Sequence, residues 1–308
     1  MINYPRKVHS SILLAAAAIA IPALSCIAAT PDPAYDAFER GNYLTAIKEA
    51  EKAAATGDPA AHTLLGEIYS KGLGVGRDYK KAARWYEKAV SLGDENAQLA
   101  LGLLLSEGLG VKVNRTRAAD LFEKSARAGL AAAQYNMALV LIHGRVRKQN
   151  LPAAVTWLQK AAAQDHAQAL YDLAGIYSEG AGVAKDSAKA NRLLERAATL
   201  GHSTAQVEFA ILKFNGRGVE KDEAAAIRLF TTSAQKGNPV AQNRLARVYA
   251  YGAGVKEDPL EATMWHLLAR SAGVSDFKLD LYITKLTPDQ RIKAEKAAEA
   301  WAIRNLGG

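Results

Sequence analysis

The chain has 308 residues and a formal net charge of +8, with 49% hydrophobic but only 7% aromatic residues. A chain so rich in small apolar residues buries its surface most readily by close packing of helices. Its Lys and Arg residues are spread along the sequence, which gives a mild preference for anionic partners. No base-stacking pattern accompanies them, so nucleic-acid binding is not expected.

The first 29 residues have the features of a signal peptide. Arg6 and Lys7 precede an apolar run, Ser11–Ala29, that ends in small residues. The run approaches the length that spans a bilayer, but Pro22 interrupts it. We therefore expect cleavage near Ala29 and a mature protein in the periplasm or secreted. Retention of this segment as a helical anchor is a lesser alternative.

Cys26 is the single cysteine and lies at the end of the apolar run. It follows Ala23, Leu24 and Ser25, which together resemble an imperfect lipoprotein processing box. If Cys26 is acylated, the protein is a membrane-tethered lipoprotein, and this alternative stays open. In either case the mature chain forms no internal disulfide, so its stability must come from packing.

Repetition at an interval of 36 residues is the strongest pattern in the sequence. Glycine recurs from Gly72 to Gly252, and alanine recurs from Ala61 to Ala241 and from Ala82 to Ala262, without exception. Six units in register predict a repeat protein, because each unit alone cannot cover its own apolar face. The predicted fold class is all-α, a right-handed superhelical solenoid of stacked helix pairs.

Each unit predicts two antiparallel helices, over Pro59–Lys71 and about Tyr79–Leu92 in the earliest full unit. Gly72 occupies the place of a left-handed helix cap, and Asp78 and its Asp or Asn equivalents can cap the second helix. The alanine columns are expected at helix contacts, where a larger side chain would separate the axes. Another column is expected to fill the space between units: Trp85, Leu121, Trp157, Leu193, Leu229 and Trp265.

The run from Ala61 to Asp94, with its alanine, leucine and glycine pattern and its Gly-Leu-Gly-Val loop, resembles the Sel-one-like repeat, a relative of the tetratricopeptide repeat. The resemblance covers six units, residues 59–274. A tetratricopeptide-like helix pair, residues 30–58, precedes them. Residues 275–308 depart from the period and predict capping helices, the last one opened by Thr287 and Pro288. The resemblance implies an interaction module that assembles or regulates other proteins.

Two columns of the first helix vary while the scaffold columns stay constant. A solenoid would present these columns as one continuous inner surface. We hypothesise that this surface receives a helix or an extended segment of another protein. The alternative, that the side chains pack against the neighbouring helix, stays open. The apolar members are Leu99, Leu103, Tyr135, Leu139, Tyr171, Val207 and Ile211.

One inter-helix loop breaks the pattern, because Val146 and Arg147 replace the second glycine and the valine of other units. The loop carries three cations, Arg145, Arg147 and Lys148. This loop could contact an acidic protein or an anionic envelope polymer. It could equally be a drifted loop without a role in binding.

No constellation of reactive residues predicts an enzyme. The histidines fall at different repeat positions, apart from His166 and His202. No Cys, Asp or Glu cluster accompanies these two, so a metal site is not expected. No cofactor is expected either. His166 and His202 are expected at the surface.

Ser233 and Lys236 match an SxxK motif, but Ser233 lies in a small helix-contact column and no SDN or KTG triplet follows. We therefore predict an exported scaffold or adaptor that binds other envelope proteins. The alternative is an envelope hydrolase, or a binder, that acts on β-lactam or peptidoglycan-like ligands.

Overall fold

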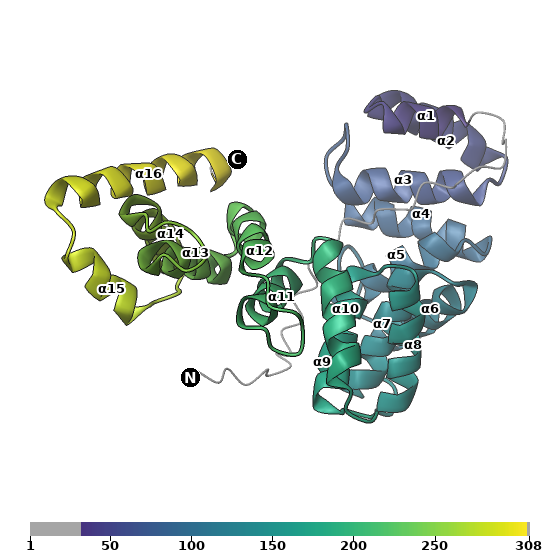
Figure 1. Ribbon diagram of the computed structural model, residues 1–308. Coiled ribbons are helices and arrows are strands. Elements are labelled where there is room, and N and C mark those ends of the chain that lie inside the picture. Colours follow the sequence, from purple (N-terminus) through teal and green to yellow (C-terminus); the bar gives the residue numbers. More distant parts are fainter. Residues whose placement is uncertain (1–31, 307–308) are drawn as a thin grey trace. The chain divides into compact units, whose positions relative to one another are not determined.

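The computed structural model describes residues 32–306, and every regular element in that range is an α-helix (Figure 1). The chain divides into two compact units between Gln164 and Asp165. Consecutive helices pack against one another from α1 to α8 in the first unit and from α9 to α14 in the second. The predicted all-α class, with helix pairs stacked in series, is confirmed.

The first unit contains α1 (Pro33–Glu39), α2 (Tyr43–Ala55), α3 (Pro59–Lys71), α4 (Tyr79–Ser91), α5 (Glu95–Glu107), α6 (Arg115–Ala128), α7 (Ala131–His143) and α8 (Leu151–Ala163). The second unit contains α9 (Ala167–Glu179), α10 (Ser187–Thr199), α11 (Ser203–Asn215), α12 (Glu223–Gln235), α13 (Pro239–Tyr251), α14 (Pro259–Ser271), α15 (Phe277–Thr284) and α16 (Pro288–Leu306). The odd-numbered helices from α3 to α13 open a repeat, and the even-numbered helices from α4 to α14 close it.

Two caps set the boundaries of each helix pair. Gly72 ends α3 in the left-handed conformation, with φ of 73°, and the equivalent glycines of the later repeats do the same. An L side chain would be strained there. Asp78 accepts the backbone N–H of Lys81 and so begins α4, and the Asp or Asn of each later repeat caps its second helix in the same way. Both predicted caps are confirmed.

The core combines one alanine column on each helix of a pair with larger apolar side chains from both helices. Both alanine columns are buried, as predicted for helix contacts. The bulk of the core comes from a column of the second helix that the sequence analysis did not single out. Its members are all buried: Tyr86, Phe122, Leu158, Leu194, Phe230 and His266.

The tryptophan and leucine column fills the space between units only in part. Leu121 and Trp265 are buried. The other members are half-buried: Trp85, Trp157, Leu193 and Leu229. The expectation was therefore too simple, because the fully buried column lies one residue further along the second helix.

Residues after the last repeat form α15 and α16. Gln290 donates its backbone N–H to Thr287 Oγ1 (3.3 Å), and Thr287 donates its N–H to Gln290 Oε1 (3.0 Å), which is the predicted capping box. Helix α16 packs against α14 and buries Trp301. Among the described residues, no helix combines the length and apolarity needed to cross a membrane. The predicted signal peptide, residues 1–29, and Cys26 lie outside the described residues.

Candidate partner-binding surfaces

In the first unit, three of the predicted contact residues form what we call the α5–α7 surface: Leu103, Tyr135 and Leu139. All three are half-buried, and Leu103 also packs against the core cluster of this unit. Tyr135 and Leu139 are one turn apart on α7 and so share a face, and Leu103 is the equivalent of Leu139 on α5. Leu99 is different, because it is buried in the core of this unit. Leu99 therefore fits the packing alternative and not a partner surface.

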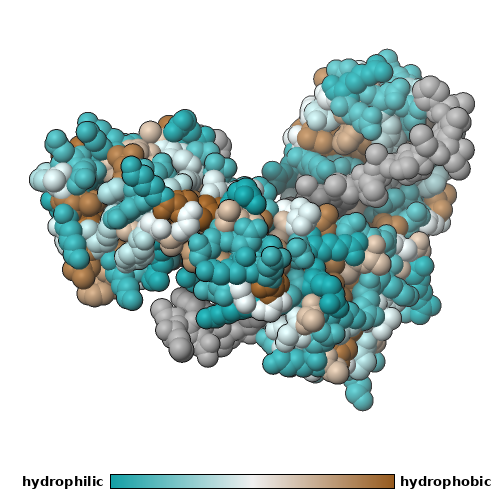
Figure 2. Space-filling model, in the orientation of Figure 1, coloured by the Kyte–Doolittle hydropathy of each residue, from teal (hydrophilic) through white to brown (hydrophobic). Residues whose placement is uncertain are grey.

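In the second unit, internal contacts engage the predicted residues. Val207 is buried, and Ile211 packs against the core cluster. Tyr171 donates its hydroxyl to Glu208 Oε1 (2.8 Å), and its ring stacks on His202 with centroids 4.6 Å apart. Packing within the unit thus accounts for all three side chains. The surface of Figure 2 is mostly hydrophilic, with hydrophobic residues in small separate groups.

The variable columns become polar at both ends of the repeats, where charged partners surround them. Glu67 is buried and pairs with Lys71 Nζ (2.5 Å). Burial and then the charge of Glu67 raise the pKa of Tyr35, on α1, to about 12. At the other end, Asp276 accepts hydrogen bonds from Asn243 Nδ2 (3.0 Å) and Arg247 Nε (2.5 Å). The polar ends therefore connect the repeats to the flanking helices.

The cationic loop between α7 and α8 is held by one of its own cations. Arg147 forms an ion pair with Asp120 of α6. At the equivalent position Val75, Val111 and Val255 pack against the core clusters. In this loop, the ion pair of Arg147 therefore takes the place of the contact that valine makes with the core in other repeats.

The other two cations of the loop, Arg145 and Lys148, are exposed. Burial lowers the pKa of His143 at the end of α7, and the charge of Arg145 lowers it further. The positive field of the loop therefore reaches the end of α7.

Two histidines other than His166 and His202 contribute to the core. His62 is buried and packs edge-on against Trp85, and His266 is fully buried with its Nε2 2.8 Å from Asp280 Oδ1. Their repeat positions belong to the core, and the imidazole ring is apolar enough to fill them.

His166 and His202 have a structural role that spacing alone did not reveal. Each begins a helix and accepts a backbone N–H at Nδ1, from Ala169 (3.2 Å) and Ala205 (3.1 Å) respectively. Burial lowers the pKa of both imidazoles. Among the described residues, no three His, Cys, Asp or Glu side chains gather as a metal ion would require.

Ser233 is a packing residue, as predicted. It has no exposed surface, its Oγ lies 3.0 Å from Ser203 Oγ, and it also donates to the carbonyl of Ser203 (3.3 Å). Ser125, its equivalent in the first unit, donates likewise to the carbonyl of Glu95. A substrate cannot reach Ser233 without opening the core, so the SxxK match supports no hydrolase.

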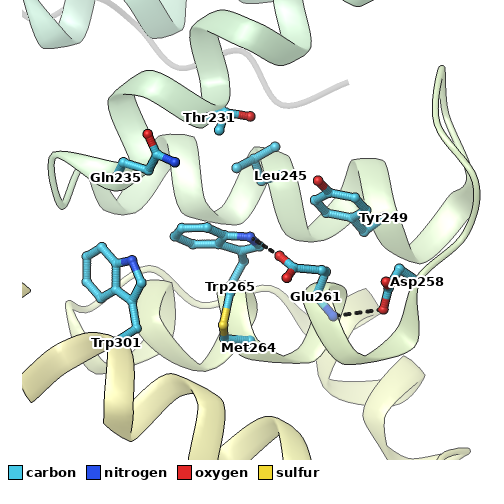
Figure 3. A pocket seen from close by; sticks show the side chains of 9 residues that line it. All are labelled: Thr231, Gln235, Leu245, Tyr249, Asp258, Glu261, Met264, Trp265 and Trp301. Carbon is cyan, nitrogen blue, oxygen red and sulfur yellow. Dashed lines mark hydrogen bonds between the residues drawn. The ribbon is translucent and has the colours of Figure 1, made fainter. Parts of the chain in front are cut away.

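The second unit also contains an open pocket of about 390 Å³ between α12, α13, α14 and α16 (Figure 3). Trp265 and Trp301 line it, with ring centroids 5.7 Å apart in an edge-to-face arrangement. Trp265 donates from Nε1 to Glu261 Oε2 (2.8 Å), which fixes the indole. Figure 3 shows Glu261, Asp258 and Tyr249 on one side of the Trp265 ring and Trp301 on the other. The remaining lining residues are Thr231, Gln235, Leu245 and Met264.

The pocket is negatively charged. Burial raises the pKa of the Tyr249 hydroxyl, and the charges of Glu261 and Asp258 raise it further. None of the nine lining residues, all from the described part of the chain, is Lys or Arg. The repeat pattern did not predict this pocket, although Asp258, Glu261 and Trp265 follow one another at helical spacing at the start of α14.

Comparison with protein-family models identifies the family of the repeats. Six consecutive segments match the family model of the Sel1 repeat: residues 59–94, 96–130, 131–166, 167–202, 203–238 and 239–274. A search of curated proteins finds no match.

Two solved structures resemble the chain over most of its length. A Sel1 repeat protein from Oxalobacter formigenes has a TM-score of 0.72 and 31% identity, and the match covers 78% of this chain and 98% of that one. The protein c5321, a protective antigen of uropathogenic Escherichia coli strains with an SLR fold, has a TM-score of 0.56 and 28% identity. That match covers 88% of this chain and 68% of c5321.

Proposed function

This chain belongs to the Sel1 repeat family, whose members are generally scaffolds for protein–protein interaction, and on this premise we propose that it is an exported scaffold or adaptor of the cell envelope. Export rests on the amino-terminal sequence. Arg6 and Lys7, the apolar run and its small-residue end together have the pattern of a secretory signal. The lipoprotein alternative through Cys26 differs only in how the protein is retained.

The observation that carries the binding proposal is the α5–α7 surface. Leu103, Tyr135 and Leu139 belong to columns that vary in residue type along the repeats, and all three are half-buried, whereas the alanine columns are buried. An amphipathic helix binds by placing its apolar face against an apolar surface of its partner. A partner would complete the burial of this surface.

The charge beside this surface indicates the partner's chemistry. Helix α7 carries Tyr135 and Leu139, and the loop that follows it exposes Arg145 and Lys148. A partner that lies along α7 therefore meets apolar side chains first and cations at the end. We propose that the occupant is an amphipathic helix of another envelope protein that has acidic residues at one end.

Export is tested by fusing residues 1–29 to a reporter enzyme that becomes active only after its disulfides form outside the cytoplasm. The proposal predicts an active fusion, and it predicts an inactive one when Leu14→Arg interrupts the apolar run. An inactive unmodified fusion would contradict export. Labelling with a fatty acid, lost in Cys26→Ser, would identify the lipoprotein form.

Binding is tested by recovering partners from the envelope with the purified protein and its variants. Tyr135→Ser and Leu139→Ser should lower recovery of a partner at least about fivefold while the thermal melting temperature changes little. Leu44→Ser is the matched control, because Leu44 is 69% exposed on α2, away from this surface. Unfolding by either serine variant, or unchanged recovery with both, would contradict the proposal.

A further inference from the structure

Trp265 differs from Trp85 and Trp157, its equivalents on other second helices, in the charged group that lies beside the indole ring. Lys88 Nζ lies 4.5 Å from the ring centroid of Trp85, and Lys160 Nζ lies 4.4 Å from that of Trp157. In both cases the ammonium comes from the same helix, three residues further on. An indole face attracts a cation because the ring carries negative charge above its plane.

Trp265 has no lysine at the corresponding position, because residue 268 is leucine. Its helix instead supplies carboxylates, Glu261 four residues before it and Asp258 at the cap. The indole thus lies in a pocket that has the anionic partners of a bound cation but no lining cation of its own. The pocket is confined to the second unit and is separate from the α5–α7 surface.

We propose that this pocket binds a lysine or arginine side chain presented by a partner protein. The inference rests on the proposed function, since it assumes a protein partner, and it adds a second point of contact with different chemistry. The aliphatic stem of such a side chain would contact Trp265 and Trp301. Its charged head would face Glu261 and Asp258.

The carboxylates retain acceptor atoms for this role. Glu261 uses Oε2 for the bond to Trp265, which leaves Oε1 outside that bond. Asp258 accepts the amides of Leu260 and Glu261 at Oδ1, which leaves Oδ2 outside the cap. An anionic ligand would be repelled here, and a neutral apolar ligand would desolvate both carboxylates without compensation. A cation is therefore the occupant that the pocket favours.

The test follows the indole N–H signals of the purified, nitrogen-15-labelled protein by nuclear magnetic resonance. The chain has four tryptophans, and single Trp→Phe variants assign their signals. The probes are the Nα-acetyl methylamides of lysine and arginine. The matched neutral probes are those of norleucine and citrulline, which keep the stem and remove the charge.

The proposal predicts a saturable shift of the Trp265 signal with the lysine and arginine probes, and at least about tenfold weaker binding of the neutral ones. Glu261→Gln and Asp258→Asn should each weaken lysine-probe binding at least about threefold. Both variants keep the fold, because glutamine still accepts from Trp265 and asparagine caps the equivalent helices at Asn114 and Asn150. Asp222→Asn, the same cap one repeat earlier and outside the pocket, should leave binding unchanged.

Equal shifts with charged and neutral probes would overturn the proposal. So would unchanged binding in both carboxylate variants, or cation shifts that are as large at Trp85 and Trp157. Because the probes replace the partner, the result is independent of the α5–α7 surface. If the probes fail while Tyr135→Ser still loses a partner, the pocket inference alone falls. If the probes bind while no partner is recovered, the proposed function falls together with the partner protein assumed here, whereas cation binding by the pocket stands.

Discussion

Phe122 packs directly on the backbone of α5 because residue 102 is glycine. A Cβ at Gly102 would lie 2.6 Å from Phe122 Cε1, closer than packed carbon atoms approach. Gly66 and Tyr86 have the same relationship one repeat earlier. Where the large column holds Leu158 instead of an aromatic residue, the facing position is alanine. Glycine therefore admits the aromatic ring in the two earliest repeats, whereas Phe230 faces Ala210.

Gly102→Ala should destabilise the protein, although alanine favours a helix interior over glycine by about 1 kcal/mol. We expect a net loss of about 1–3 kcal/mol, because the added methyl group collides with the Phe122 ring. Urea unfolding measures the difference. The double variant Gly102→Ala, Phe122→Leu should recover part of the loss.

Gly175 is the matched control, because it is also a helical glycine, but a Cβ added there would have no other atom within 4 Å. Gly175→Ala should stabilise the protein by up to about 1 kcal/mol. Equal effects of the two Gly→Ala substitutions would show that size matching does not govern the helix contact.

The contact between Asp276 and Arg247 should make the attachment of α15 weaker at acid pH than at neutral pH. Burial raises the pKa of Asp276, but the hydrogen bonds from Arg247 and Asn243 outweigh it and lower the pKa overall. In the unfolded chain the pKa of an aspartate is about 3.9, and at pH values above it the lowered pKa of Asp276 stabilises the folded state. This stabilisation is lost as pH falls through the lower pKa that Asp276 has in the folded state.

Asp276→Asn should therefore cost about 2 kcal/mol at pH 7, the scale of charged hydrogen bonds. The difference between variant and unmodified protein should shrink as the pH approaches 3. Thermal melting over this range measures it. A difference that stays constant with pH would contradict the assignment.

His166 and His202 should make the second unit less stable in mild acid. Each accepts a backbone N–H at Nδ1, and protonation of that atom removes the cap. Burial holds the pKa of both imidazoles below the usual value of about 6.5. As pH falls, these imidazoles are therefore protonated in the unfolded chain before they are protonated in the folded chain. Their contribution to the stability of the folded state is complete above about pH 6.5 and is lost as pH falls through the folded pKa.

Asparagine is a suitable replacement, because Asn238 caps α13 at the equivalent position. The double variant His166→Asn, His202→Asn should melt at a temperature that varies less between pH 7 and pH 5 than that of the unmodified protein. An unchanged pH dependence would mean that the two imidazoles are not the source.

Arg147→Val should leave stability unchanged or raise it slightly. Exposed ion pairs such as Arg147–Asp120 contribute about 0–1 kcal/mol, whereas burial of a valine side chain contributes about 1.5–3 kcal/mol when complete. Valine already packs at this place in other repeats. A loss above about 2 kcal/mol in urea unfolding would show that the loop needs the ion pair.

The sequence predicted the helix boundaries well because the caps are identical in type from repeat to repeat. Gly72 and Asp78 each belong to columns in which one backbone requirement admits few residues. The large core column was missed because its requirement is volume. Tyr86, Leu158 and His266 satisfy that requirement with different chemistry, so no single residue type marks the column.

The aromatic pocket could not be predicted from periodicity. Trp301 lies after the last repeat, so the interval of 36 residues says nothing of its position relative to Trp265. Burial along the variable columns could not be predicted either, because Leu99 is buried and Leu103 is half-buried although both lie in variable columns. Side-chain depth at these positions depends on the neighbouring repeat.

Photo-crosslinking in living cells tests the central claim most directly. A benzophenone amino acid placed at Tyr135 or Leu139 should give, on irradiation, one discrete adduct with an envelope protein, whereas the same group at Lys124, exposed on α6, should give none. The adduct should disappear when the neighbouring residue of the α5–α7 surface is changed to serine. Absence of any adduct from both positions, or the same adduct from Lys124, would contradict a partner-binding role for this surface.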